Sequence, residues 1–250
     1  MERVITSVGH RGFRIGVEEN TFMAFDKAVE LGLDFIEFDV QLSSDGVPVV
    51  FHDKDMERMV GIKGKIRDFS LKEIKDLRTV NFQQKIPTLQ EVFERYGNTV
   101  GFIIELKDPE STDAVIHALK TMSNKKGVCI SGRDIRCLNK AYNSLVYSCI
   151  CLNITKCKDY TLEDFYKAEC REDIPVPCEI ISLSAQLMNE RFIKKCKQLG
   201  IQVSMWNLDP EKEGRKWAEE WIPKGIDMIL FDDPSHYKHF MSEQSNLILN

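Results

Sequence analysis

Short apolar runs rich in β-forming residues alternate with amphipathic stretches along the sequence, and this alternation is the feature that most limits the fold. Eight such runs occur: RVITSVG (3–9), DFIEFDVQL (34–42), VGFIIEL (100–106), GVCIS (127–131), LVYSCICL (145–152), EIISLS (179–184), IQVSMW (201–206) and IDMILF (226–231). The stretches between them, such as NERFIKKCKQLG (189–200) and PEKEGRKWAEEW (210–221), carry apolar residues at helical spacing. Strands that alternate with helices indicate a parallel sheet covered by helices.

Eight repeats of this unit predict a closed (β/α)8 TIM barrel, with an open, doubly wound sheet as the alternative. We expect one domain over residues 1–250, because that length is ordinary for a barrel; two domains are the alternative. Residues 54–86 break the rhythm, since they are polar and weakly helical around SLKEIKDL (70–77). We interpret them as a small inserted subdomain.

The second run is followed closely by another strand-like run, VPVVFHD (47–53), which is too near for a parallel crossover. The two runs are therefore predicted to form an antiparallel hairpin. A two-residue turn at Asp45 and Gly46 would place His52 opposite Asp39, and a four-residue loop would place it opposite Glu37. In both cases His52 is expected on the face that carries these two carboxylates.

Composition limits the partners and the compartment. A net charge of -5 gives nucleic acid no electrostatic reason to bind. The N-terminal segment resembles neither a signal peptide nor a membrane span, and no run approaches ~18 apolar residues, so we expect no integral membrane association. The eight cysteines show no zinc or CxxC spacing and are predicted to be reduced, mostly buried thiols of a cytoplasmic protein. Disulfides in a secreted form are the alternative.

Polar residues gather where the predicted strands end. In a barrel these ends would meet at the C-terminal rim, where the active sites of such barrels lie. The residues are His10, Arg11, Glu37, Asp39, His52, Glu105, Lys107 and Trp206. Taken singly, each has a structural alternative, such as a surface ion pair between Glu105 and Lys107.

Three carboxylates on neighbouring strands, Glu37, Asp39 and Glu105, would repel one another unless protons or a cation compensate them. A hard divalent ion, Mg²⁺ or Ca²⁺, is the simpler remedy, since no cysteine lies near in sequence. His10 and His52 would then be free to act as general base and general acid near neutral pH. Arg11 and Lys107 are suited to hold an anionic oxygen, so the set fits phosphoryl chemistry.

With these residues assembled, the sequence resembles the glycerophosphodiester phosphodiesterase family. The matching stretches are GHRG (9–12), EENTFMAF (18–25), DFIEFDVQLSSDGVPVVFHD (34–53), IPTLQEVF (86–93), IIELK (103–107), MW (205–206) and GIDMILFDDP (225–234). They follow in order over nearly the whole chain. The first half is highly specific, whereas residues 108–200 match only in pattern.

The resemblance implies a (β/α)8 barrel with a small insertion after the hairpin. It implies that Glu37, Asp39 and Glu105 bind one divalent metal ion and that His10 and His52 are the acid/base pair. It also places Arg11 and Lys107 near the phosphate, assigns Glu19 and Asn20 to the ENT motif, and sets Trp206 on the glycerol side. The expected reaction is hydrolysis of a small glycerophosphodiester to sn-glycerol 3-phosphate and an alcohol.

The sequence departs from the family pattern at several positions. Glu18 stands where the family usually has proline, and Ser131-Gly132 stands where members often have Ser-Phe. Asn207 and Phe231 each replace a usual threonine. These departures concern substrate preference more than activity. The alternatives are a lysophospholipase D or a phospholipase-like lyase acting on lipid phosphodiesters, and a catalytically silent module that binds phosphoesters.

Overall fold

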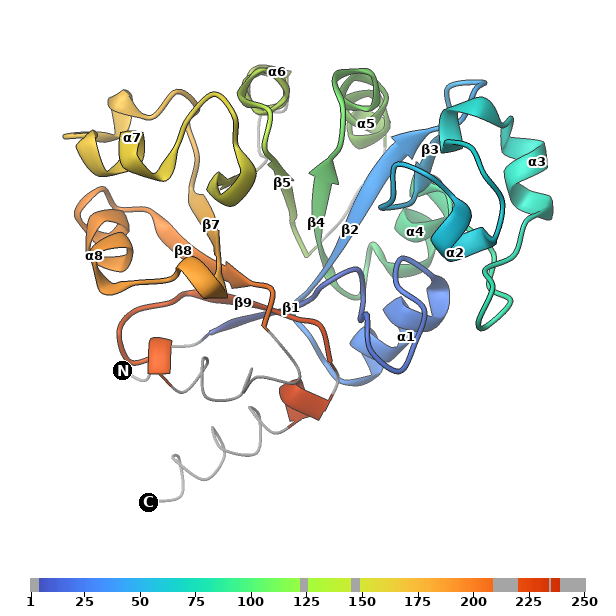
Figure 1. Cartoon of the computed structure of the whole chain (residues 1–250), viewed down its shortest axis with the longest axis horizontal. Coiled ribbons are helices and arrows are strands. Elements are labelled where there is room, and N and C mark those ends of the chain that lie inside the picture. The colour runs from blue at the N-terminus through green and yellow to red at the C-terminus, as the bar shows by residue number, and fades with distance from the viewer. Residues whose placement is uncertain (1–4, 122–125, 145–148, 209–219, 234, 239–250) are drawn as a thin grey trace.

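The computed structural model describes residues 5–121, 126–144, 149–208, 220–233 and 235–238. Eight parallel strands form the barrel (Figure 1): β1 (Thr6–Gly9), β2 (Phe35–Leu42), β4 (Gly101–Leu106), β5 (Val128–Gly132), β6 (Cys149–Asn153), β7 (Ile180–Ser184), β8 (Gln202–Trp206) and β9 (Met228–Phe231). The first strand, β1, pairs in parallel with both β2 and β9, which closes the sheet. The predicted (β/α)8 barrel is confirmed, and the open doubly wound alternative is wrong.

Helices cover the outside of the barrel (Figure 1). They are α1 (Phe22–Glu30), α4 (Leu89–Tyr96), α5 (Pro109–Thr121), α6 (Ile135–Ser144), α7 (Leu162–Lys167) and α8 (Glu190–Gln198). Several begin at a hydroxyl or amide cap; the Thr21 side chain, for example, accepts from Ala24 N at the start of α1. Residues 145–148 of the predicted fifth strand and 209–219 of the predicted last helix lie outside the described residues.

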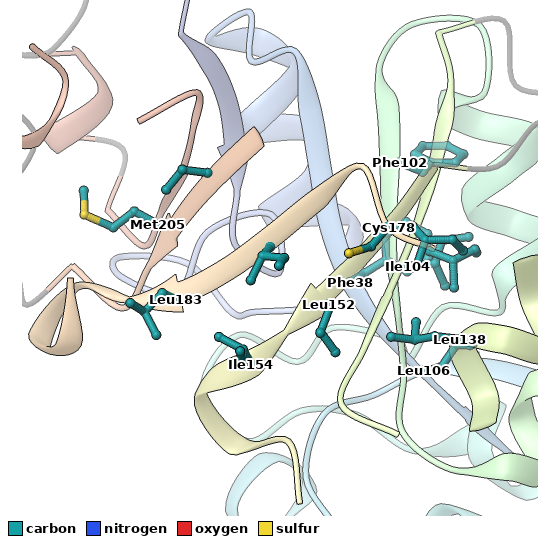
Figure 2. Close-up of a cluster of buried hydrophobic side chains, with 14 of the residues drawn as sticks. Phe38, Phe102, Ile104, Leu106, Leu138, Leu152, Ile154, Cys178, Leu183 and Met205 are labelled. Carbon is teal, nitrogen blue, oxygen red and sulfur yellow. The ribbon is translucent and has the colours of Figure 1, made fainter. Parts of the chain in front are cut away.

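The apolar side chains of the barrel strands lie in two layers, one outside the barrel and one inside it. On β4, Phe102, Ile104 and Leu106 point outward into the layer beneath the helices, where they lie with Phe38 and Leu138 (Figure 2). Burial of each such side chain stabilises the fold by about 1.5–3 kcal/mol. The alternate residues face the barrel interior, which is filled by Val8, Ile103, Cys129, Cys151, Ile180, Met228 and Leu230. Because alternate residues share a side, the polar residues of the strand ends also face inward.

The hairpin partner of β2 is a short strand, β3 (Pro48–Val50), antiparallel as predicted. Its register pairs Val40 with Val50, and Ser43 N donates to Val47 O at 3.0 Å, so the loop has three residues. The predictions of a two- or a four-residue loop were both wrong by one residue, because Gly46 adopts the left-handed conformation (φ 78°) that closes a three-residue loop. His52 therefore lies beyond the end of β3 instead of opposite a carboxylate.

Between β3 and α4 the chain forms α2 (Glu57–Val60), the 3₁₀ turn η1 (Ile66–Asp68) and α3 (Leu71–Asp76), which lie beside β3 in Figure 1. A separate apolar cluster lies under these elements: Val49, Phe51, Met56, Met59, Val60, Ile66, Ile74 and Ile86. Further single 3₁₀ turns are η2 (Ile154–Lys156), η3 (Arg171–Asp173) and η4 (Ala185–Leu187).

Two expectations concern the environment of the chain: that its cysteines are reduced, and that it has no membrane span. All eight cysteines are free thiols, and most are buried. In the part of the chain that the structure describes, every helix is too short or too polar to cross a bilayer.

Candidate active site

The GHRG loop after β1 folds back tightly on itself, and both glycines are needed for this. A Cβ on Gly9 would lie 2.1 Å from the carbonyl oxygen of Gly12, and a Cβ on Gly12 would lie 2.7 Å from Ala24 of α1. Arg11 between them has a positive φ of 55°, an uncommon conformation for a residue with a side chain. This geometry directs the Arg11 N–H to Glu37 Oε2 at 2.9 Å.

Three inward-facing carboxylates meet beside this loop. Glu37 and Asp39 are alternate residues of β2, and Glu105 of β4 is in register with Asp39. One oxygen from each lies within 4.8 Å of the others, and all three side chains are buried. The structure therefore brings together the predicted metal ligands.

The charges in this cluster are incompletely balanced. Burial, and then the charges of Asp39 and Glu105, raise the pKa of Glu37 well above its usual value. Burial also acts to raise the pKa of Asp39, but the charges of Lys107 and Arg11 outweigh it and lower that pKa. Lys107 Nζ lies 2.6 Å from both Asp39 Oδ1 and Glu105 Oε1. Lys107 thus forms ion pairs with two of the three carboxylates.

A divalent cation fits this cluster. Carboxylate oxygens are among the ligands that Mg²⁺ and Ca²⁺ prefer, and a cation would offset the charges of Asp39 and Glu105, which add to burial in raising the pKa of Glu37. Glu19, His52 and Asp53 form a second group of similar spacing. There the Arg58 guanidinium already bonds both acids, with Nε 2.6 Å from Asp53 Oδ2 and Nη2 2.7 Å from Glu19 Oε1. The Glu37 cluster is therefore the better candidate for a metal centre.

His10 is held by an acid from the far end of the chain. Its Nδ1 lies 2.6 Å from Asp232 Oδ1, just after β9, and its Nε2 lies 3.9 Å from Glu37 Oε2. Burial acts to raise the pKa of Asp232, but the charge and hydrogen bond of His10 outweigh it and lower that pKa. Asp232 is therefore ionised and accepts the Nδ1 proton. Sequence reasoning missed this role, although barrel closure sets the end of the last strand beside the first.

His52 has a similar partner. Its Nδ1 lies 2.7 Å from Asp53 Oδ1, and the side chain is about one-third exposed. Burial acts to raise the pKa of Asp53, but hydrogen bonds from His52 and Arg58 outweigh it and lower that pKa. Phe51 N, of the residue just before His52, donates to Asp39 O at 3.0 Å, so this histidine follows a residue bonded to the end of β2 that carries Asp39 despite the shifted register. Asp53 was visible in the sequence as the neighbour of His52, whereas Arg58 gave no sequence signal.

The sequence of residues 10–236 matches the profile of the Glycerophosphoryl diester phosphodiesterase family. The chain belongs to this family. A glycerophosphodiester phosphodiesterase of Caldanaerobacter subterraneus subsp. tengcongensis is 32% identical over 250 residues, which cover 91% of this chain and 93% of the relative. A human lysophospholipase D is 35% identical over 272 residues, with 94% of this chain and 85% of the relative covered.

Solved structures agree in fold. The glycerophosphodiester phosphodiesterase of Thermotoga maritima superposes with a TM-score of 0.76 at 29% identity, covering 93% of this chain and 96% of that one. A phosphodiesterase of Oleispira antarctica, solved in complex with the product sn-glycerol-3-phosphate, gives a TM-score of 0.81 at 24% identity, covering 95% and 96%. The chain is thus a phosphodiesterase that acts on glycerophosphodiesters.

The basic residues predicted to lie near the phosphate contact acids in the structure of this family member. Arg11 Nη1 lies 2.7 Å from Glu19 Oε1, and its Nε lies 3.4 Å from Asp39 Oδ2. Asn20 Nδ2 donates to Asp39 Oδ2 at 2.9 Å. Glu19 and Asn20 therefore link the loop after β1 to the carboxylate cluster. Whether Arg11 and Lys107 bind phosphate stays a prediction.

Trp206 at the end of β8 faces the same space. Its ring packs edge-on against His10, with centroids 6.3 Å apart, and its Nε1 is buried without a hydrogen-bond partner. It lines a cavity at the barrel mouth that also contacts His10, Glu37 and Glu105. Trp206, which the resemblance sets on the glycerol side, therefore borders the carboxylate cluster and His10 of the phosphodiesterase.

Glu18, one of the departures from the family pattern, is buried and has a structural partner. Its carboxylate accepts hydrogen bonds from Thr79 Oγ1 and, at 3.0 Å, from Phe82 N. It joins the loop before α1 to the segment before α4. Its charge is therefore held by hydrogen bonds within the fold and is not presented at the site entrance.

Proposed function

We propose that this chain hydrolyses glycerophosphodiesters to sn-glycerol 3-phosphate and a free alcohol with the help of one divalent ion, Mg²⁺ or Ca²⁺. The observation that carries this proposal is the meeting of three buried carboxylates, Glu37, Asp39 and Glu105, with two histidines that are each backed by an acid. These carboxylates would hold the ion, whose chemistry when bound is to act as a Lewis acid on phosphoryl oxygens.

The two histidines divide the proton transfers. In hydrolysis, an attacking oxygen loses a proton as its bond to phosphorus forms. Attack by water gives sn-glycerol 3-phosphate directly, whereas attack by a hydroxyl of the substrate first gives a cyclic phosphate, which water opens by the same exchange of protons. The bond from phosphorus to the alcohol oxygen breaks, and that oxygen gains a proton. Asp232 and Asp53 hold His10 and His52 through Nδ1, which leaves Nε2 of each for these transfers.

The glycerol moiety packs on Trp206 in this proposal. An aromatic face suits the carbon–hydrogen groups of glycerol, and the unpartnered Nε1 offers a donor to its oxygens. The complex of the Oleispira antarctica phosphodiesterase with sn-glycerol-3-phosphate supports a small-molecule ligand of this class. The alcohol headgroup is expected to point toward solvent.

We propose that the chain works as one barrel domain over 1–250, with residues 54–86 as a small inserted subdomain. The separate apolar cluster beneath α2 and α3 supports the insertion. We also propose that the protein lies in the cytoplasm. Its cysteines are free and mostly buried, and a reducing compartment favours free cysteines.

A second candidate, a lysophospholipase D acting on lysophospholipids, is favoured by two observations. The human lysophospholipase D is 35% identical over nearly the whole chain. In addition, Ile15, Val80 and Phe82 are exposed, at 42%, 44% and 44%. Ile15 N donates to the carbonyl oxygen of Asp232 at 3.1 Å, so the backbone of Ile15 lies next to the acid that holds His10. An acyl chain would find apolar surface there.

Product analysis on matched substrates separates the candidates. Purified protein would be given glycerophosphocholine, glycerophosphoethanolamine and lysophosphatidylcholine, with Mg²⁺ or Ca²⁺ and with a chelator. We expect a higher kcat/KM for the two deacylated diesters, and sn-glycerol 3-phosphate as their product. A much higher kcat/KM for lysophosphatidylcholine would favour the second candidate, and binding without turnover of any substrate would indicate a silent module.

A further inference from the structure

Arg133 reaches over the mouth of the barrel from the loop between β5 and α6. Its guanidinium carbon lies 5.9 Å from the centre of the Trp206 ring, and its Nη2 lies 3.6 Å from Glu105 Oε1. The residue lines the same cavity as His10 and Glu37. The next residue, Asp134, caps α6 by accepting from Arg136 N at 2.9 Å, which fixes the chain direction at this point. Arg133 therefore borders the site where the substrate is proposed to bind.

Other cationic side chains around this site are closely paired. Among the described residues, four of them each have a carboxylate oxygen at 3.3 Å or less: Arg11 with Glu19, Lys107 with Asp39, Arg58 with Asp53, and Arg14 with Asp232. Arg133 differs, because its ionic contact to Glu105 is long and that oxygen already accepts from Lys107 at 2.6 Å. Its positive charge is the least compensated of the five.

The cavity also contains hydrogen-bond donors and an acceptor that have no partner among the described residues. Arg133 Nε and Trp206 Nε1 are buried and have no hydrogen-bond partner, and neither has Asn153 Oδ1. All three residues line the cavity. A buried polar group without a partner costs free energy, so groups of this kind gathered in one cavity indicate a polar ligand.

We infer that Arg133 is a substrate-binding residue that contacts the phosphate of the diester. This inference rests on the proposed function. A phosphodiester carries one negative charge, which matches Arg133, the cation at this site, among the residues that the structure describes, without a carboxylate oxygen at 3.3 Å or less. The guanidinium is planar and can donate two parallel hydrogen bonds to phosphate oxygens while it stacks on an aromatic ring. The cation–π contact with Trp206 orients the guanidinium toward the cavity that both residues line.

Calorimetric titration of inorganic phosphate and of sn-glycerol 3-phosphate tests the inference directly. The proteins are the wild type, R133M, R133K and the matched control R136M, which removes an exposed arginine from the same segment. We expect R133M to weaken the binding of both ligands about 10- to 100-fold, which is the usual effect of losing hydrogen bonds to a charged group. R133K keeps the charge without the planar fork and should weaken them less, and R136M should bind as the wild type does.

Two results would overturn the inference. Unchanged phosphate affinity in R133M is one, and a loss confined to sn-glycerol 3-phosphate is the other, because that would place Arg133 on the glycerol. Melting curves verify folding, and R133K provides the comparison if R133M does not fold. Each titration is repeated with a chelator, so that the proposed function and the role of Arg133 are tested separately. The wild type with and without chelator shows whether binding depends on metal, and the variants compared with the wild type show the role of Arg133.

Discussion

His10 Nδ1 and Asp232 Oδ1 lie 2.6 Å apart across the seam where the last strand of the barrel closes on the first. Both side chains are buried, and Arg14 Nη1 lies 3.3 Å from the same Asp232 oxygen. The contact fixes the ring orientation of His10 and leaves its Nε2 toward the carboxylate cluster. The residue that orients this candidate catalytic histidine is thus supplied by the segment after the last strand of the barrel.

Asp232→Asn should lower kcat and change KM little, because Asp232 positions His10 and does not itself reach the carboxylate cluster. We expect the loss to be smaller than that of His10→Ala and to change the pH profile of kcat. The matched control is Asp233→Asn, which alters the next acid, a cap for Ser235 N. Equal kcat in wild type and Asp232→Asn would leave His10 without a positioning partner.

The His10–Asp232 contact should also affect how the stability of the protein depends on pH. The pKa of Asp232 is lowered on folding, so its ionised form stabilises the protein above the unfolded pKa of 3.8, and this stability is lost as the pH falls through the folded pKa. Asp232→Asn should therefore be less stable than the wild type by about 1–3 kcal/mol at pH 6. Denaturant unfolding at several pH values should show this difference shrinking below pH 3.8. A constant difference would contradict the assignment.

Replacing His10 or His52 by alanine should each lower the rate about 10²- to 10⁴-fold, the usual contribution of a positioned proton donor or acceptor. Initial rates on glycerophosphocholine measure this, and calorimetry checks that the variants still bind Mg²⁺. His117, on α5 outside the barrel, provides a matched control in His117→Ala. Near-normal rates in both variants would return these histidines to a structural role.

Much of this architecture could be predicted from the sequence. The apolar alternation of the runs around Glu37 and Glu105 fixes which side of each strand faces inward, and closure of parallel strands brings their ends together. Residues that depend on loop conformation were harder to find. The left-handed Gly46 shifts the hairpin register by one residue. Arg58, on α2, and Arg133, on the loop after β5, reach the site only because of how the segments that carry them fold. Local sequence carries little information about such approaches.

Glu18 should be a stability determinant. It is buried and accepts from Thr79 Oγ1 and Phe82 N, so Glu18→Ala would leave these donors without their partner. We expect a loss of about 1–3 kcal/mol in the free energy of unfolding. Glu163→Ala, at an exposed position on α7, should change it by less than about 0.5 kcal/mol. Equal stability of the two variants would show that the Glu18 contacts contribute nothing.

The central claim is that Glu37, Asp39 and Glu105 hold a divalent ion that the phosphodiesterase needs. Its most direct test is ³¹P NMR of glycerophosphocholine with metal-stripped protein, before and after addition of Mg²⁺ or Ca²⁺. Glu105→Gln and, as a control, Glu110→Gln on the exposed start of α5 are measured alongside. We predict no sn-glycerol 3-phosphate without metal, recovery on addition for the wild type and Glu110→Gln, and little recovery for Glu105→Gln. Full turnover by the metal-stripped protein, or by Glu105→Gln, would contradict the claim.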